Sequence, residues 1–226
     1  PDELLVNEPA CWTLKADEDW HGFDGLPDDW CLLDPVKPGI LSPGMGMDGK
    51  MAVTGVPAAV VASYLEARGI IPSRTTDFMI LPLFSIGVTK GKWGSLINAL
   101  LNFKEDYDAN LGLEHVLPKL VESAPDLYGS MGLKDLGDRM FAHMKENRID
   151  RWQAEAFGSL PQPDLPPREA FFRLQEGEAD LVPLTEAAGR TTGVGLIPYP
   201  PGIPIVMPGE NLGPSDGPWI SYLSAL

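Results

Sequence analysis

The distribution of its 23 prolines constrains the fold of this 226-residue chain more than any other feature. Four prolines lie within residues 161–167, and five more lie within residues 196–208. Proline has no backbone N–H to donate to a neighbouring strand, so neither stretch can form the centre of a regular sheet. We therefore expect 161–167 to be an ordered linker and 196–208 to be a rigid, extended crossing.

The composition predicts a folded chain with a real core, because 44% of the residues are apolar and six are Trp, eight Phe and five Tyr. No apolar run reaches the length of a membrane span, and the N-terminus lacks the pattern of a signal peptide, so we expect a cytoplasmic protein without a membrane partner. Cys11 and Cys31 are accordingly expected to be reduced, buried thiols rather than a disulfide.

The net charge of −15 disfavours nucleic acid as a partner, because nucleic-acid binding needs a basic surface. Two interpretations of the acidity remain open. The acidic groups could simply form a solvated surface that keeps the protein soluble. Alternatively, the surface could be adapted to acid, where protonation of carboxylates near pH ~4 removes self-repulsion and permits close subunit contact.

Hydrophobic periodicity predicts an α+β fold for the first half of the chain. Helices are expected from Thr54, as N-cap, to Arg68-Gly69, and over 90–107 with Trp93, Leu96, Ile97, Leu100 and Phe103 on one face. Strands are expected at the apolar runs 30–33, 39–42, 69–72 and 77–87, the last of them buried. This order of elements suggests a mixed sheet with helices on one face.

From about residue 125 the pattern changes, with an amphipathic helix expected over 131–147 and another starting at Pro167. We therefore predict two domains, 1–124 and 125–226.

Two glycine-rich stretches resemble nucleotide-binding motifs but fail their requirements. Residues 44–49 fit G-x-G-x-x-G, yet no helix opens at the third glycine, so a loop or hairpin tip is expected. Residues 87–93 have Trp93 where a phosphate loop needs Ser or Thr, so a turn leading into a helix is expected. His21, His115 and His143 have no metal-ligand spacing: His115 and His143 are expected at the surface and His21 in the core. No metal site and no catalytic residue is predicted.

Seven sequence blocks stand out along the chain: Trp20-His-Gly-Phe, Asp34-Pro-Val-Lys, Leu41-Ser-Pro-Gly-Met-Gly, Thr54-Gly-Val-Pro-Ala-Ala-Val-Val, Phe84-Ser-Ile-Gly-Val-Thr-Lys-Gly-Lys-Trp-Gly, Phe103-Lys-Glu-Asp-Tyr-Asp-Ala-Asn and Ile197-Pro-Tyr-Pro-Pro-Gly-Ile-Pro. These blocks resemble the bacterial ornithine/lysine/arginine decarboxylase family, and they follow the family order along nearly the whole chain. Three further blocks, at residues 74–78, 131–138 and 208–211, are most similar to the inducible, acid-responsive arginine enzyme.

The resemblance implies a subunit of the fold-type I enzymes, which use pyridoxal phosphate. It assigns 1–124 to the aminotransferase-like small domain and 125–226 to a truncated Orn/Lys/Arg decarboxylase C-terminal domain. In the family the cofactor lysine follows a histidine, and none of the nine lysines here does. No cofactor-binding residue is therefore expected, and the anchor should lie upstream of Pro1. The implied partners are the remainder of the same polypeptide and a homodimer that assembles into a larger ring.

The contribution expected of this chain is a wall of the substrate pocket. A guanidinium group pairs best with a planar carboxylate, which makes Asp77 a candidate partner for arginine. Ser73 is a second candidate, because the matching position is acidic in lysine-using relatives, and Tyr199 in the Pro-Tyr-Pro-Pro-Gly block is a third. Alternatively, Asp77 is a strand-end residue that faces water, and Tyr199 serves packing.

The sequence therefore suggests the C-terminal part of an arginine decarboxylase that forms agmatine and carbon dioxide and is inactive alone. A lysine- or ornithine-specific parent is one alternative. A separately encoded, non-catalytic module that binds a full-length decarboxylase is another.

Overall fold

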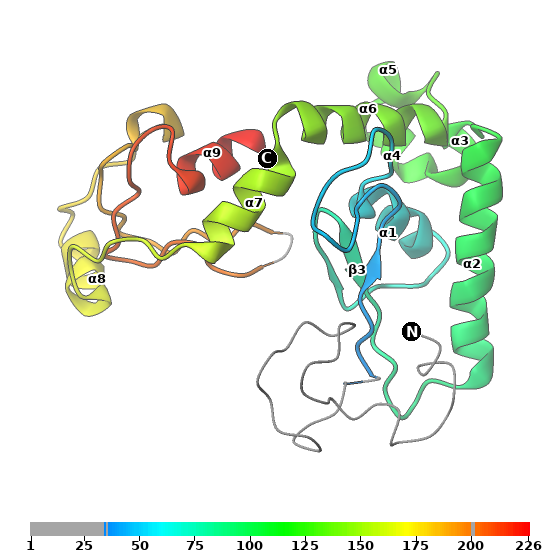
Figure 1. Cartoon of the computed structure of the whole chain (residues 1–226), viewed down its shortest axis with the longest axis horizontal. Helices are drawn as coiled ribbons and strands as arrows, with labels where there is room; N and C mark the ends of the chain where they lie inside the picture. Colours follow the sequence, from blue (N-terminus) through cyan, green and yellow to red (C-terminus); the bar gives the residue numbers. More distant parts are fainter. Residues whose placement is uncertain (1–33, 35, 200–201) are drawn as a thin grey trace.

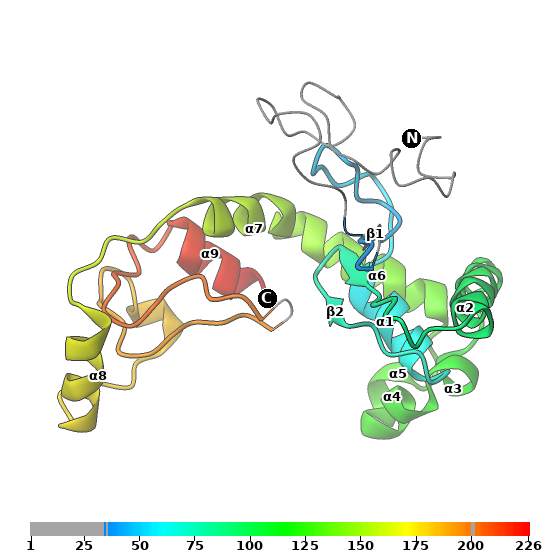
Figure 2. The ribbon, with the colours of Figure 1, turned by 90° about the horizontal axis from the view of Figure 1, so that it is seen from below.

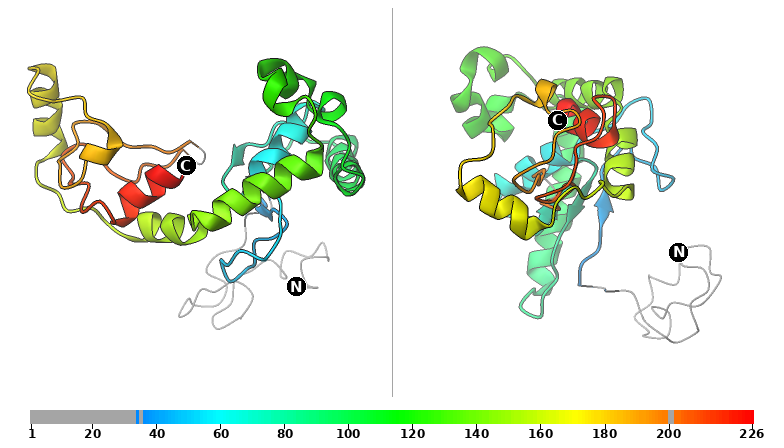
Figure 3. Two further views of the ribbon diagram at one scale, coloured as in Figure 1. Left: turned by 90° about the horizontal axis from the view of Figure 1, so that it is seen from above. Right: turned by 90° about the vertical axis from the view of Figure 1, so that its left-hand side faces the viewer.

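The structure of the chain, a computed structural model, describes residues 34, 36–199 and 202–226 (Figure 1). Cys11, Cys31, His21 and the strand expected at 30–33 lie outside these described residues. The described part forms two lobes at opposite ends of a pair of consecutive helices, α6 (Leu133–Glu146) and α7 (Ile149–Gly158) (Figures 2 and 3).

The first lobe is built on a three-stranded sheet with the order β1-β3-β2. Its strands are β1 (Ile40–Leu41), β2 (Arg74–Thr75) and β3 (Met79–Leu81), and both pairings with β3 are antiparallel. The predicted α+β class is confirmed. The sheet described by the structure is antiparallel rather than mixed, and no strand forms at the expected position 69–72.

The long buried strand expected over 77–87 is wrong in extent. Only Met79–Leu81 pairs as a strand, and beyond it Leu83 and Ile86 are 45% and 109% exposed. Pro82, which has no N–H to donate, directly follows the last paired residue, and the chain leaves the sheet there. The apolar run predicts a longer buried strand because apolar composition alone does not reveal where strand pairing ends.

In the first lobe, helix α1 (Ala58–Glu66) packs against strands β2 and β3. The second predicted helix is confirmed as α2, whereas α1 starts later than expected, at Ala58 with Pro57 as its N-cap, not Thr54. Gly69, with φ of +77°, takes the left-handed closing conformation predicted after the first helix. The helices are α1 (Ala58–Glu66), α2 (Lys90–Asp108), α3 (Leu113–Val116), α4 (Pro118–Ser123) and α5 (Pro125–Tyr128).

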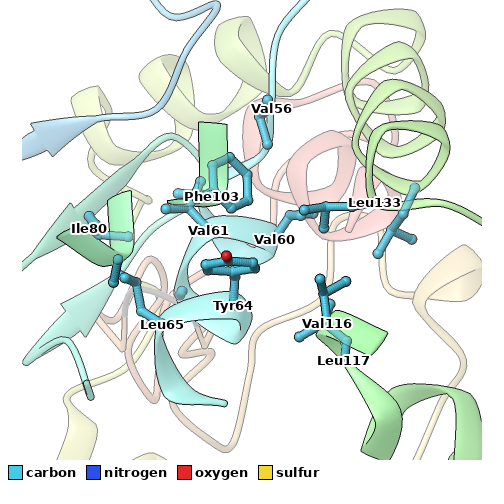
Figure 4. Packing of buried hydrophobic residues seen from close by; sticks show 14 of the residues in the cluster. Val56, Val60, Val61, Tyr64, Leu65, Ile80, Phe103, Val116, Leu117 and Leu133 are labelled. Atoms are coloured by element: carbon cyan, nitrogen blue, oxygen red, sulfur yellow. The ribbon is translucent and has the colours of Figure 1, made fainter. Parts of the chain in front are cut away.

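The core of the first lobe forms around α1 (Figure 4). The ring of Tyr64 is fully buried and meets Phe103 of α2 edge-on, with 5.1 Å between ring centroids. The Tyr64 hydroxyl donates to Asp106 over 2.5 Å, so the polar end of this buried side chain is paired. Two residues expected on the buried face of α2, Trp93 and Ile97, are instead 46% and 47% exposed.

The second lobe packs around α7 and α9 (Pro218–Ala225), which are joined by α8 (Pro167–Gln175), the 3-10 turn η3 (Leu184–Glu186) and long irregular segments. Helix α8 starts at Pro167, as predicted. The indole N–H of Trp219 in α9 donates to the carbonyl of Ala156 in α7 over 3.3 Å. Fully buried Tyr222 and Val206 lie in the same core.

The two proline-rich segments behave differently. Residues 161–167 are ordered as expected: Asp164 and Leu165 both donate their N–H groups to Gly209. Residues 196–208, expected to be a rigid, extended crossing, do not run straight. Leu196 pairs with Val206, so the chain reverses direction between these two residues. The reversal is possible because Leu196 and Ile205, unlike the prolines around them, keep N–H groups that donate across the turn.

Helix α6 contributes residues to both hydrophobic cores. The first core includes Leu136 near the start of α6, and the second includes Met144 near its end. Between α6 and α7, Arg148 adopts a left-handed conformation, with φ of 54°, which ends one helix before the next begins. The predicted domain boundary between 124 and 125 stays a prediction.

Candidate functional site around Asp77

Asp77 lies in the short loop that connects β2 to β3. The hydroxyl of Thr76 accepts hydrogen bonds from the backbone N–H groups of Phe78 and Met79, over 3.3 and 3.0 Å, which shapes this loop. The carbonyl of Asp77 itself accepts from the N–H of Ala58, the first residue of α1, over 3.1 Å. The backbone of Asp77 is thereby held between the sheet and a helix start.

The carboxylate of Asp77 reaches the second lobe. Its Oδ2 accepts hydrogen bonds from Nε2 of Gln153 in α7, over 2.5 Å, and from the hydroxyl of Tyr222 in α9, over 2.9 Å. Gln153 Nε2 also lies 3.5 Å from the Tyr222 oxygen. Phe78, the next residue, packs into the core of the second lobe. This loop therefore connects the two lobes through a hydrogen-bond network and an apolar contact.

Burial controls the acidity of this network. Loss of solvent raises the pKa of Asp77 above its ordinary value, and the hydrogen bond from Tyr222 partly offsets this effect. Burial, followed by the nearby Asp77 charge, likewise raises the pKa of Tyr222 well above its usual range. Tyr222 therefore acts as a hydrogen-bond donor to Asp77 at neutral pH.

Asp77 lines a cavity of about 510 Å³ at the junction of the two lobes. Apolar side chains form most of the wall, among them Met131, Met140 and Leu226. Arg139 and His143 of α6 supply cationic or hydrogen-bonding groups to the same wall. A mostly apolar cavity with a few placed polar groups is typical of small-molecule sites. Its charges suit a ligand that carries a cationic group for Asp77 and an anionic group for Arg139.

The other two predicted substrate residues do not line this cavity. Ser73 is exposed, and its N–H donates to the carbonyl of Leu81. Tyr199 is 89% exposed and lies in the loop that turns back between Leu196 and Val206. Their roles in substrate binding stay predictions, as does that of Asp77.

Gln153 and Tyr222 are functional-site residues that the sequence does not predict. They lie 76 and 145 residues from Asp77, in helices whose patterns mark only which face is apolar. Glutamine in an amphipathic helix is ordinarily a surface residue, and tyrosine is ordinarily a packing residue, so neither had a local signal.

A pyridoxal phosphate cofactor would need a lysine enclosed in a pocket to form its Schiff base. All eight lysines in the described part of the chain are exposed: Lys37, Lys50, Lys90, Lys92, Lys104, Lys119, Lys134 and Lys145. The described residues therefore do not fit the role of cofactor anchor. The predicted surface positions of His115 and His143 are confirmed. Within residues 34, 36–199 and 202–226, no cluster of side chains could hold a metal ion, and no helix is long and apolar enough to cross a membrane.

Two sequence profiles of one enzyme family match the chain. The profile of the Orn/Lys/Arg decarboxylase major domain matches residues 2–92, and that of the Orn/Lys/Arg decarboxylase C-terminal domain matches residues 150–226. Together they cover most of the chain and agree with the resemblance seen in the sequence blocks.

Individual relatives give the same result. The chain is 49% identical to the biodegradative arginine decarboxylase of Escherichia coli K12, over all of this chain and 30% of that protein. It is 41% identical to the lysine decarboxylase LdcA of Pseudomonas aeruginosa, over 94% of this chain and 28% of that protein. The chain thus spans less than a third of the length of these curated relatives.

Solved structures match the fold over nearly the whole chain. The constitutive lysine decarboxylase of E. coli superposes with a TM-score of 0.86 at 37% identity, over 97% of this chain and 31% of that one. The Francisella novicida lysine decarboxylase LdcF superposes with a TM-score of 0.88 at 36% identity, over 100% of this chain and 31% of that one. With these profiles, identities and superpositions in agreement, the chain belongs to the Orn/Lys/Arg decarboxylase family.

Proposed function

We propose that this chain is the C-terminal part of a pyridoxal-phosphate-dependent decarboxylase that converts L-arginine to agmatine and carbon dioxide. The identity to an arginine decarboxylase, 49%, carries this proposal. Identities to lysine decarboxylases are 37–41%, and those to ornithine decarboxylases are 31–32%. The role of this part is to form a wall of the substrate pocket and contacts between subunits, while the Schiff-base lysine belongs to the rest of the parent enzyme.

Asp77 is the residue that we propose to select the substrate. Its carboxylate lines a largely apolar cavity, where attraction to a cation is less screened than in water. A guanidinium presents two parallel N–H donors that match a carboxylate, whereas an ammonium is a point charge. Tyr222 and Gln153 both donate to Oδ2 and orient the group, which leaves the two lone pairs of Oδ1 as acceptors for the substrate. Ser73 and Tyr199 are proposed as further contacts, made in the complete enzyme.

Asp77→Asn in the full-length parent tests this role. The substitution keeps the shape and removes the charge, so kcat/KM for arginine should fall by roughly tenfold or more, which is about 1.4 kcal/mol of transition-state stabilisation. Asp126→Asn is the matched control, because Asp126 is exposed and does not line the cavity. Unchanged kinetics in Asp77→Asn would mean that Asp77 serves only to join the lobes.

A lysine-specific parent is the second candidate, because three solved lysine decarboxylases superpose on the chain. Steady-state kinetics of the parent with arginine, lysine and ornithine separate the two substrates directly. A kcat/KM for lysine above that for arginine would reject the arginine assignment and keep the decarboxylase assignment.

A further inference from the structure

Helix α2 has apolar side chains on two sides. One side is buried in the core of the first lobe and includes Leu96 and Phe103. On another side, Trp93, Ile97 and Leu101 are 46%, 47% and 57% exposed, and their spacing of four residues aligns them along the helix. We call these three residues the outer stripe. Figures 1 and 2 show α2 along the outer edge of the first lobe. A surface helix normally has a single apolar side, which faces the core, so the outer stripe needs a separate explanation.

The exposed apolar surface continues into the loop before α2. Leu83 and Ile86 in this loop are 45% and 109% exposed. A third side of α2 is polar instead, and its exposed residues include Asn98 and Asn102. Large exposed apolar side chains are therefore concentrated along one side of α2 and just before its start, rather than spread around the helix. Such a concentration is typical of a surface that another protein segment covers.

Two lysines without an ion pair lie at the start of α2. Lys90 and Lys92 are exposed, and neither forms an ion pair within residues 34, 36–199 and 202–226. Further along the helix, Lys104 pairs with Asp108 over 2.5 Å. Unpaired cations beside an apolar surface favour a partner surface with acidic groups at its edge. The partner that fits this side of α2 therefore presents apolar residues to the outer stripe and carboxylates to Lys90 and Lys92.

The family comparisons indicate where such a partner lies. This chain covers 30% of the biodegradative arginine decarboxylase of E. coli, so most of the proposed parent lies outside it. The major-domain profile matches residues 2–92, so Leu83, Ile86 and the first turn of α2 belong to the end of that match. A segment of the same polypeptide is present at a high effective concentration, which favours a contact within one subunit over a contact with a second one.

We infer that the outer stripe of α2, together with Leu83 and Ile86, docks onto the part of the parent's major domain that lies outside this chain. That part covers the stripe with apolar residues and places acidic groups beside Lys90 and Lys92. The inference rests on the proposed function, because it takes this chain as part of a longer decarboxylase. It does not depend on the substrate, because an arginine-specific and a lysine-specific parent would dock in the same way.

A photo-cross-linking side chain in the full-length parent identifies what covers the stripe. Ile97→benzoylphenylalanine should give a link within one polypeptide, to a peptide outside these 226 residues. Denaturing electrophoresis separates links within one polypeptide from links between two, and mass spectrometry of the monomer-sized band identifies the linked peptide. Asn98→benzoylphenylalanine is the matched control, because Asn98 is exposed on the polar side of α2, and it should give no such link.

Hydroxyl-radical oxidation gives a second readout that needs no substitution in the stripe. Trp93 should be oxidised about fivefold more slowly in the parent than in the 226-residue chain, because a docked surface excludes water from the residues that it covers. Peptide mass spectrometry measures the rate at this residue, and the urea-unfolded parent gives the rate at full exposure.

The same readout tests the acidic edge of the partner. Lys90→Glu with Lys92→Glu places like charges against the expected carboxylates and should speed the oxidation of Trp93 in the parent by roughly twofold or more. Lys119→Glu is the control, because Lys119 is exposed in α4, away from the stripe, and its Trp93 should be oxidised at the wild-type rate.

Four results would overturn the inference. A cross-link of dimer mass would assign the stripe to a contact between subunits. No link from position 97, or equal oxidation of Trp93 in chain and parent, would show that the stripe stays open to solvent. An unchanged rate in the lysine double variant would remove the acidic edge from the partner. Both readouts are independent of activity, so a parent that does not decarboxylate arginine would reject the proposed function and leave this test decisive.

Discussion

At the scale of single residues, Asp77 illustrates how one half-buried carboxylate serves two purposes. It joins a loop of the first lobe to α7 and α9 of the second, and it presents a negative group to the junction cavity. Burial makes its ionised form costly, which raises its pKa, while the two donors orient it and Tyr222 partly stabilises the charge. The stability of the chain must therefore depend on the protonation of Asp77.

The direction of this dependence follows from linkage. Because the pKa of Asp77 in the folded chain lies above 3.8, the folded state keeps the proton over a pH range in which the unfolded chain has lost it. The resulting stabilisation is fully present below pH 3.8 and is lost as the pH rises through the raised value. The stability of the wild type relative to Asp77→Asn, which stays neutral, should therefore fall as the pH rises from about 4 to 7.

Urea unfolding of both chains across this range measures the difference. Asp126→Asn, at an exposed position, is the control, and its stability relative to the wild type should change less with pH. A parallel pH profile for wild type and Asp77→Asn would show that burial does not perturb Asp77.

At the scale of elements, the start of α6 depends on a residue that lies outside the helix. Its N-cap, Gly132, has no side chain to cap the free N–H groups, and Oδ1 of Asn110 accepts from those of Lys134 and Asp135 instead, over 2.9 and 3.1 Å. A Cβ at position 132 would lie 2.1 Å from that Oδ1 and 2.6 Å from the Asn110 carbonyl oxygen, so the close approach requires glycine. Asn110 itself is left-handed, with φ of 47°, a conformation that asparagine tolerates well.

Asn110→Ala should therefore lower the free energy of unfolding by about 2 kcal/mol, through loss of the cap and strain at a positive φ. Urea denaturation of the 226-residue chain measures the change. Asn98→Ala, at an exposed position within α2, is the matched control and should be neutral or slightly stabilising. Equal stabilities of the two variants would show that the start of α6 is held by packing alone.

At the scale of the whole molecule, the chain has the fold of its family, and the lysines that the structure describes are all exposed. We predict that the 226-residue chain with pyridoxal phosphate neither decarboxylates arginine nor forms a lysine adduct that borohydride traps. The physical reason is that its described lysines are exposed, where a Schiff base is open to water. The full-length parent is the positive control, and a stoichiometric trapped adduct on the chain would refute the assigned division of roles.

The net charge of −15 leads to a prediction about assembly of the parent. Like charges repel within a Debye length of ~8–10 Å, and protonation of carboxylates toward pH ~5 lowers the cost of subunit contact. Sedimentation velocity from pH 8 to 5 should show a dimer converting to a larger ring in acid, with the transition sensitive to salt. Neutralising Asp17-Glu18-Asp19, which lie outside the described residues, should shift the transition to higher pH.

A dimer that persists at every pH would reject the acid-assembly interpretation. A ring transition that these substitutions leave unmoved would place the switch outside this chain, and the acidity would then serve solubility.

The sequence by itself determined the features that depend on local chemistry. The 3–4 periodicity located α2, a proline marked the start of α8, Gly69 closed the first helix, and the sequence blocks identified the family. The helix features can be predicted from sequence because they depend on residues that are close in the chain. Helical hydrogen bonds join residues four apart, and the conformations of proline and glycine are set at single positions.

Only the tertiary structure decided which residues meet. Trp93 and Leu96 share the same periodic pattern, yet one is exposed and the other buried, because burial depends on what packs against α2. The charge of Asp77 makes it a candidate from the sequence alone. Its hydrogen-bond partners, Gln153 in α7 and Tyr222 in α9, become apparent only in the tertiary structure. Pairing across 145 residues depends on how α7 and α9 pack against the first lobe, and a local pattern of residue types carries no information about such long-range packing.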